Sequence, residues 1–134
     1  MRLLLDTHIA LWAVEDNPRL SGQARLLIAD ESNEIVCSAA SAWEVAIKHA
    51  LHPDKMMIDG KEFIGLCAEA GLAELPIAHR HVEALETLSR CEGAKPHNDP
   101  FDKIMLAQAK CDGLLFLTHD SLMDAYEEPC LLHV

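Results

Sequence analysis

Short apolar runs alternate with longer amphipathic segments along the chain, and this alternation limits the possible folds more than any other feature. The runs typical of strands are Arg2–Leu5, Glu34–Cys37, Leu72–Leu75, Leu114–Thr118 and Pro129–His133. Helical patterns occupy the intervals at Ile9–Val14, Gly22–Ser32, Ala39–Leu51, Lys61–Ala70, Ala78–Ser89, Phe101–Cys111 and Leu122–Tyr126. Strands separated by helices predict a parallel sheet covered on both faces. With 134 residues and no linker or repeat, we predict one α/β domain over residues 1–134.

The charge balance limits the partners of such a domain. The chain has 22 acidic against 11 basic residues and a formal net charge of −11. A protein this acidic is unsuited to coating nucleic acid by charge alone. An enzyme whose metal ion faces the phosphate remains possible, and the charge also favours a basic protein partner.

The cysteines and the hydropathy pattern indicate the compartment. The five cysteines are odd in number and form no Cys-x-x-Cys motif; they are Cys37, Cys67, Cys91, Cys111 and Cys130. Because Cys37, Cys111 and Cys130 have apolar neighbours in sequence, we predict reduced, mostly buried thiols in a cytoplasmic protein. No apolar run is long enough to span a membrane, and Met1–Leu5 is too short for the core of a signal peptide.

Four acidic residues are the candidate site. Asp6 and Asp120 follow the first and fourth apolar runs, while Glu44 and Asp102 lie near predicted helix starts. Each one alone is explained by helix capping, since Asp and Glu are favoured there. Ligands of open α/β sheets bind beyond the carboxyl ends of the strands, where we expect all four to converge. Carboxylates gathered there need a hard cation, so the pattern predicts Mg²⁺ or Mn²⁺.

The segment around Glu44 adds an independent argument. Ser38, Ser41, Glu44 and Lys48 recur at three- and four-residue intervals and share one face of an otherwise apolar helix. A carboxylate buried there is costly unless it is paired or bound to a cation. A Glu44–Lys48 ion pair is one explanation, and a metal ligand with Lys48 extended to solvent is the other.

Residues near the acids receive lesser roles. Thr7 and Thr118 can orient a metal-bound water or a carboxylate, or simply satisfy local backbone groups. The candidate RNA contacts are Lys48, Lys95, His97, Lys103 and His119, for each of which a solvated surface position is the alternative. The His49-x-x-His52 and His79-x-His81 pairs have no companion ligand pair, so zinc is disfavoured.

Four segments together resemble the PIN-domain nucleases, especially VapC-type toxins of type II toxin–antitoxin pairs. They are Leu4-Leu5-Asp6-Thr7-His8, Ser41-Ala42-Trp43-Glu44-Val45-Ala46-Ile47-Lys48, the stretch from His97-Asn98-Asp99-Pro100-Phe101-Asp102 to Ala109, and Leu117-Thr118-His119-Asp120. They come in the family's order and span nearly the whole chain. Lys103 stands where Arg is common in the subgroup, so a bidentate contact made by Arg would be lost.

The resemblance implies a three-layer α/β/α PIN-like fold with a central parallel five-stranded sheet. It also implies Mg²⁺- or Mn²⁺-dependent cleavage of RNA by Asp6, Glu44, Asp102 and Asp120, with Asp99 as an N-cap or auxiliary acid. An antitoxin partner and a homodimer, with residues 61–70 and 78–89 as candidate surfaces, are implied as well.

Two other enzyme classes fit poorly, and one binding role stays open. A receiver domain needs adjacent acids after its first strand, and a haloacid-type phosphatase needs a second Asp where His8 stands. The open alternative is a catalytically inactive PIN-like module whose acids grip a basic protein partner.

Overall fold

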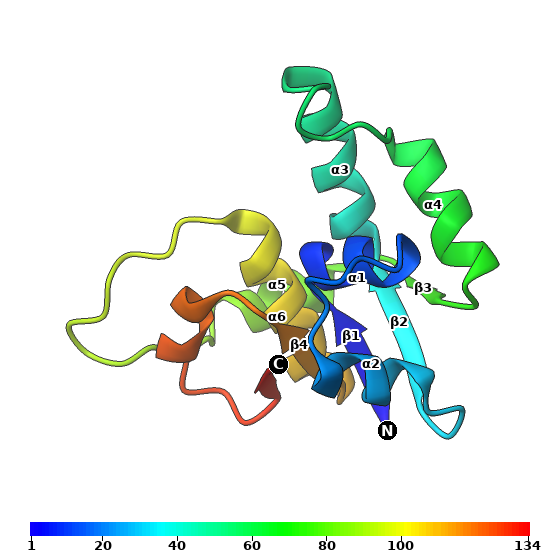
Figure 1. Ribbon diagram of the computed structural model, residues 1–134. Helices are drawn as coiled ribbons and strands as arrows, with labels where there is room; N and C mark the ends of the chain where they lie inside the picture. The colour runs from blue at the N-terminus through cyan, green and yellow to red at the C-terminus, as the bar shows by residue number, and fades with distance from the viewer.

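A parallel sheet forms the centre of the computed structural model, which describes residues 1–134 (Figure 1). The five strands are β1 (Arg2–Leu5), β2 (Glu34–Ser38), β3 (Ala73–Leu75), β4 (Leu115–Thr118) and β5 (Leu131–His133). The helices are α1 (Thr7–Val14), α2 (Gly22–Ala29), α3 (Ala39–Leu51), α4 (Gly60–Glu69), α5 (His79–Leu85), α6 (Pro100–Asp112) and the short 3₁₀ helix η1 (Ser121–Ala125). The strand order is β3-β2-β1-β4-β5 and every neighbouring pair is parallel, which confirms the predicted α/β class.

Alternate residues of the central strands serve the two faces of the sheet. In β1, Leu3 and Leu5 enter the core formed with α1, α2 and α4, whereas Leu4 enters the core formed with α6. All three side chains are fully buried. Helices therefore cover both faces, with α5 packed on α6, and the three-layer arrangement is confirmed (Figure 1).

The predicted elements are all present, but some ends differ. The bounds of α3 agree with the prediction, whereas α5 ends at Leu85 instead of Ser89. It stops early because the backbone N–H of Ser89 donates to the carboxylate of Glu128. The predicted last helix is a single 3₁₀ segment. Both differences depend on contacts or geometry that the helical pattern does not contain.

The cysteines are all free thiols, but the predicted burial is wrong for Cys111. Cys37 and Cys67 are buried, Cys130 is half-buried, and Cys91 and Cys111 are exposed. Cys111 lies in the last turn of α6. No helix of the structure combines the length and apolar character required to cross a membrane.

The carboxyl ends of the strands lead directly into helices and place polar side chains along one edge of the sheet. Asp6 follows β1 and is the N-cap of α1, while Ser38 ends β2 and is the N-cap of α3. Asp120 follows β4 and caps η1. Because β1 and β4 are neighbours, Asp6 and Asp120 come to adjacent positions on this edge, as predicted.

The left-handed backbone conformation of Gly113 at the end of α6 can be tested by substitution. Gly113 caps α6 in the left-handed region, with φ of 71°. A Cβ strains this conformation, so Gly113→Ala is expected to lower the free energy of unfolding by about 1–2 kcal/mol. Gly65→Ala is the matched control, because Gly65 lies exposed inside α4 with open space around it. There the change should raise stability by about 0.5–1 kcal/mol. Urea unfolding measures both changes in the free energy of unfolding. Equal effects of the two substitutions would contradict the left-handed cap at Gly113.

Candidate metal centre

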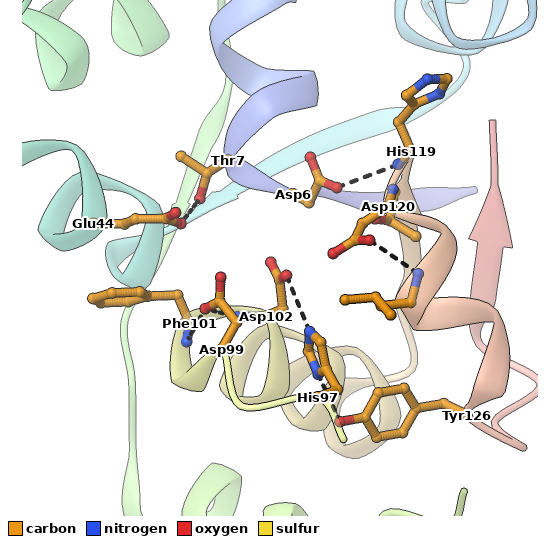
Figure 2. A network of polar contacts seen from close by, with 12 residues as sticks. Asp6, Thr7, Glu44, His97, Asp99, Phe101, Asp102, His119, Asp120 and Tyr126 are labelled. Carbon is orange, nitrogen blue, oxygen red and sulfur yellow. Dashed lines mark hydrogen bonds and ion pairs between the residues drawn. The ribbon is translucent and has the colours of Figure 1, made fainter. Parts of the chain in front are cut away.

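Five carboxylates line one hollow of about 350 Å³ at the carboxyl edge of the sheet. Its lining residues are Asp6, His8, Trp12, Arg19, Glu44, Asp99, Asp102, His119 and Asp120. The acids come from four separate parts of the chain, and Figure 2 shows their side chains converging on one space. The structure thus brings together all four predicted acids and Asp99.

Two of the acids that line the hollow, Asp6 and Asp120, are also helix N-caps. One oxygen of Asp6 accepts a hydrogen bond from the backbone N–H of Ile9, at 2.8 Å. Asp120 accepts from the backbone N–H of Leu122, at 2.9 Å. The second oxygen of Asp120 accepts no hydrogen bond from the protein, whereas Oδ2 of Asp6 lies 3.4 Å from the backbone N–H of His119. The caps therefore fix the carboxylates at the rim of the hollow without consuming them.

The first turn of α6 presents two acids with different surroundings. Asp99 is the N-cap and accepts from the backbone N–H groups of Phe101 and Asp102, as predicted for the Asp-Pro-Phe-Asp segment. The carboxylate of Asp102 receives no hydrogen bond from the protein. Its nearest cationic candidate is Nε2 of His97, 3.5 Å from Oδ2. Asp102 is thus the acid with the least compensation from protein groups.

Glu44 is compensated instead by its neighbours. The Thr7 hydroxyl donates to Oε1 at 2.6 Å, and Nζ of Lys48 contacts Oε2 at 2.5 Å (Figure 2 shows the Thr7 contact). Only 3% of the Glu44 side chain is exposed. The predicted Glu44–Lys48 ion pair is therefore present, with 41% of the Lys48 side chain exposed, and the role of Glu44 as a metal ligand stays a prediction. Thr7 positions a carboxylate, as one of its two predicted roles required.

Burial and mutual repulsion raise the proton affinity of this centre. Burial is the main factor that raises the pKa of Asp6, and hydrogen bonding by Thr118 opposes it. Burial raises the pKa of Asp102 to about 8, with further contributions from Asp99, Asp6, Glu44 and Asp120. An acid held at this value is only partly ionised at neutral pH unless a cation is bound.

The residues predicted to contact RNA do not lie together in the structure. His119 lines the acidic hollow. Lys103 lines a second hollow together with Arg90 and Tyr126 and is not among the residues that line the acidic one. Lys48 is held by Glu44. His97 is buried, with 4% of its surface exposed, so the prediction of a surface contact to RNA is wrong for this residue.

The sequence did not identify three of the residues that line the hollow: His8, Trp12 and Arg19. His8 and Trp12 are one turn apart on α1, directly after Asp6, so their spacing was a usable signal. Arg19 lies in the connection between α1 and α2, and its approach to the acids depends on the path of that connection. No sequence signal marked it.

The donor set fits a hard divalent ion. Asp6, Asp102 and Asp120 each offer carboxylate oxygen to the same hollow, and Asp102 has no competing donor. Oxygen ligands in this number suit Mg²⁺ or Mn²⁺. The nitrogen of His97 and oxygens of Asp102 and Asp120 also lie within 4.8 Å of one another. The residues present therefore fit the group that the acidic pattern predicted.

The raised pKa of Asp102 predicts how the stability of the protein changes with pH. The folded state binds the proton more tightly than the unfolded chain, so the Asp102 contribution to stability falls as pH rises from 3.8 to about 8. Asp102→Asn removes the charge, and in EDTA its stability relative to wild type should increase across this range. Urea unfolding at several pH values measures this. Asp54→Asn, at an exposed position, is the control. A difference in the free energy of unfolding between Asp102→Asn and wild type that stays constant with pH would contradict the raised pKa of Asp102.

Solved structures of three toxin–antitoxin systems resemble the fold of this chain. VapBC2 from Rickettsia felis, solved bound to a DNA fragment from its promoter, is 15% identical, with a TM-score of 0.65 over 100% of this chain and 98% of that chain. A toxin–antitoxin complex from Klebsiella pneumoniae is 18% identical, with a TM-score of 0.59 over 97% and 95% of the two chains. VapBC-1 from nontypeable Haemophilus influenzae is 15% identical, with a TM-score of 0.55 over 90% and 87%.

At these identities the structural likeness establishes a shared fold. Among curated proteins, none matches the chain significantly in sequence. The model of one protein family, the PIN domain, does match, and it covers residues 3–129. The chain therefore belongs to the PIN-domain family.

Proposed function

We propose that this protein is a Mg²⁺- or Mn²⁺-dependent endoribonuclease and the toxin of a type II toxin–antitoxin pair. The observation that carries the proposal is the carboxylate of Asp102, which lies among four other acids without a hydrogen-bond donor. A purely structural acid in such a place would be costly and would gain nothing from its neighbours. Membership of the PIN family and the fold shared with toxin–antitoxin complexes support the proposal.

Each acid has a distinct part in this proposal. Asp6, Asp102 and Glu44 hold the divalent ion, directly or through water, and Asp120 completes the shell or orients the attacking water. When bound, the ion neutralises the phosphate and lowers the pKa of a nucleophilic water. Thr7 keeps Glu44 oriented by its short hydrogen bond. The backbone N–H of His119 lies 3.4 Å from Oδ2 of Asp6 and helps to orient that carboxylate.

One wall of the hollow supports a single-stranded substrate. The Trp12 ring lies 6.0 Å from the His8 ring and 5.7 Å from the His119 ring, between centroids. Aromatic faces beside a cleavage site can stack unpaired bases of any sequence. Arg19 adds a positive charge to the same hollow and can meet a phosphate. This wall offsets, locally, the acidity that disfavours nucleic acid over the rest of the surface.

The proposed partner is an antitoxin that covers the acidic hollow. Insertion of an Arg or Lys side chain among the carboxylates would neutralise them and exclude the metal. A homodimer is also part of the proposal, and α4 and α5 expose apolar side chains at Ile64 and Val82. The net charge of −11 favours the second candidate function, a catalytically inactive module that grips a basic partner. Metal-dependent cleavage separates the two.

Asp6→Asn tests the catalytic proposal. Loss of one charged ligand should reduce Mn²⁺-dependent cleavage of RNA by at least about a hundredfold, since metal stabilisation of the transition state is worth several kcal/mol. The circular dichroism spectrum should remain that of the wild type. Asp54→Asn, the same change at an exposed position outside the hollow, should cleave normally. Full activity of Asp6→Asn, or cleavage by the wild type in EDTA, would refute the proposed role.

Trp12 gives a binding test that does not depend on cleavage. The chain has two tryptophans, so Trp43→Phe leaves Trp12 as the only indole. Stacking of a base on Trp12 should quench its fluorescence when single-stranded RNA is added in Ca²⁺ or EDTA. In the reciprocal variant, Trp12→Phe, the emission of Trp43 should change much less, because Trp43 is outside the hollow. Unchanged emission from Trp12 under binding conditions would remove this wall from the substrate site.

A further inference from the structure

His97 is the one buried side chain at the centre whose polar nitrogen lacks a partner. Only 4% of the residue is exposed, and Nε2 makes no hydrogen bond. An unsatisfied buried nitrogen normally costs free energy. The position of this unpaired Nε2 atom beside the acids therefore needs an explanation.

The ring of His97 is held firmly from its far side. Its Nδ1 lies 2.9 Å from the hydroxyl of Tyr126, and the two rings meet nearly at right angles, at 88°. Tyr126 is itself 6% exposed. Figure 2 shows the opposite edge of the imidazole directed at the carboxylate of Asp102. When Nδ1–H donates to the Tyr126 oxygen, Nε2 carries its lone pair toward the acids.

The spacing around Nε2 suits a shared ion better than a direct bond. Nε2 lies 3.5 Å from Oδ2 of Asp102, beyond the usual length of an N–H···O bond. Two ligand atoms that each lie about 2.1 Å from one ion are separated by about 3.0–3.5 Å at octahedral or tetrahedral angles. An oxygen of Asp120 completes a group of three potential ligand atoms, all within 4.8 Å of one another.

We propose that Nε2 of His97 is a nitrogen ligand of the metal centre, beside the carboxylates of Asp102 and Asp120, with Tyr126 orienting the ring. This inference rests on the proposed function, because it assumes that the carboxylates bind a divalent ion. A nitrogen ligand favours Mn²⁺ and Co²⁺ over Mg²⁺, which binds almost entirely through oxygen. Tyr126, whose oxygen accepts the hydrogen bond from Nδ1–H, stands where the acceptor partners of metal-bound histidines commonly lie.

The rival explanation is that His97 is protonated and forms an ion pair with Asp102. In that case His97 would be displaced from the acids when an ion binds, and it would never coordinate. The two explanations differ in whether nitrogen contacts the ion and in whether the loss of His97 discriminates between metals.

Electron spin-echo spectroscopy of the Mn²⁺-loaded chain tests the ligand directly. The wild type should show modulation from a coordinated imidazole nitrogen, and His97→Gln should lose it. His119→Gln and His8→Gln are essential controls, because both histidines line the hollow, and each should keep the signal. His79→Gln, on the exposed start of α5, checks for a general effect of losing a histidine.

Thermal melting with added metals provides the second measurement. We expect His97→Gln to weaken Mn²⁺ and Co²⁺ binding by about tenfold or more, with Mg²⁺ affinity changed little. Tyr126→Phe should weaken Mn²⁺ binding by a smaller factor while keeping the nitrogen signal. If His97→Gln fails to fold, the wild type with His8→Gln and His119→Gln still decides whether the nitrogen comes from another histidine of the hollow.

The outcomes separate this inference from the proposed function. Mn²⁺ binding by the wild type without nitrogen modulation would overturn the role of His97 and leave the carboxylate centre in place. Modulation that survives in His97→Gln, or disappears in His119→Gln or His8→Gln, would do the same. A wild-type chain whose melting temperature ignores Mn²⁺ would instead overturn the proposed metal centre and this inference together.

Discussion

Mutual repulsion among the carboxylates at the carboxyl edge of the sheet is the interaction on which the site depends. Asp6, Asp102 and Asp120 approach one another because β1 and β4 are neighbours and because α6 begins beside them. Burial is the main cause that raises the pKa of Asp102 to about 8, and repulsion by the neighbouring acids adds to it. Local caps and the Lys48 side chain offset part of this cost but leave Asp102 uncompensated. A divalent ion is the simplest group that removes the remainder.

The fold itself serves to maintain this arrangement. Apolar side chains from alternate positions of β1 fill two separate cores, so the strand cannot shift by one residue without exposing them. The ends of β1 and β4 are thereby fixed, and with them the acids that follow. Behind the site, Ser38 donates to the side chain of Gln108, which ties the start of α3 to α6. The acids are therefore held by packing in two layers, not by contacts among themselves.

The sequence was sufficient for the class of fold and for the convergence of the acids, because both follow from periodicity and from the geometry of parallel sheets. The strands and α3 were predicted well since their apolar patterns are strong. Features that depend on long-range contacts were not predictable. The shortened α5 depends on Glu128, the exposure of Cys111 depends on how α6 packs, and the burial of His97 depends on Tyr126, 29 residues away. Arg19 reaches the hollow through the path of a loop, for which no local pattern exists.

The most direct test of the account is the ionisation of Asp102 itself. Carbon NMR of its carboxyl group, followed against pH, reports when this one residue loses its proton. Without divalent ions the carboxyl group should titrate with a pKa near 8. With saturating Mg²⁺ its pKa should fall well below the ordinary value of 3.8. A carboxyl that titrates near 3.8 in the absence of metal, or that ignores Mg²⁺, would contradict the claim that a cation makes this cluster tolerable.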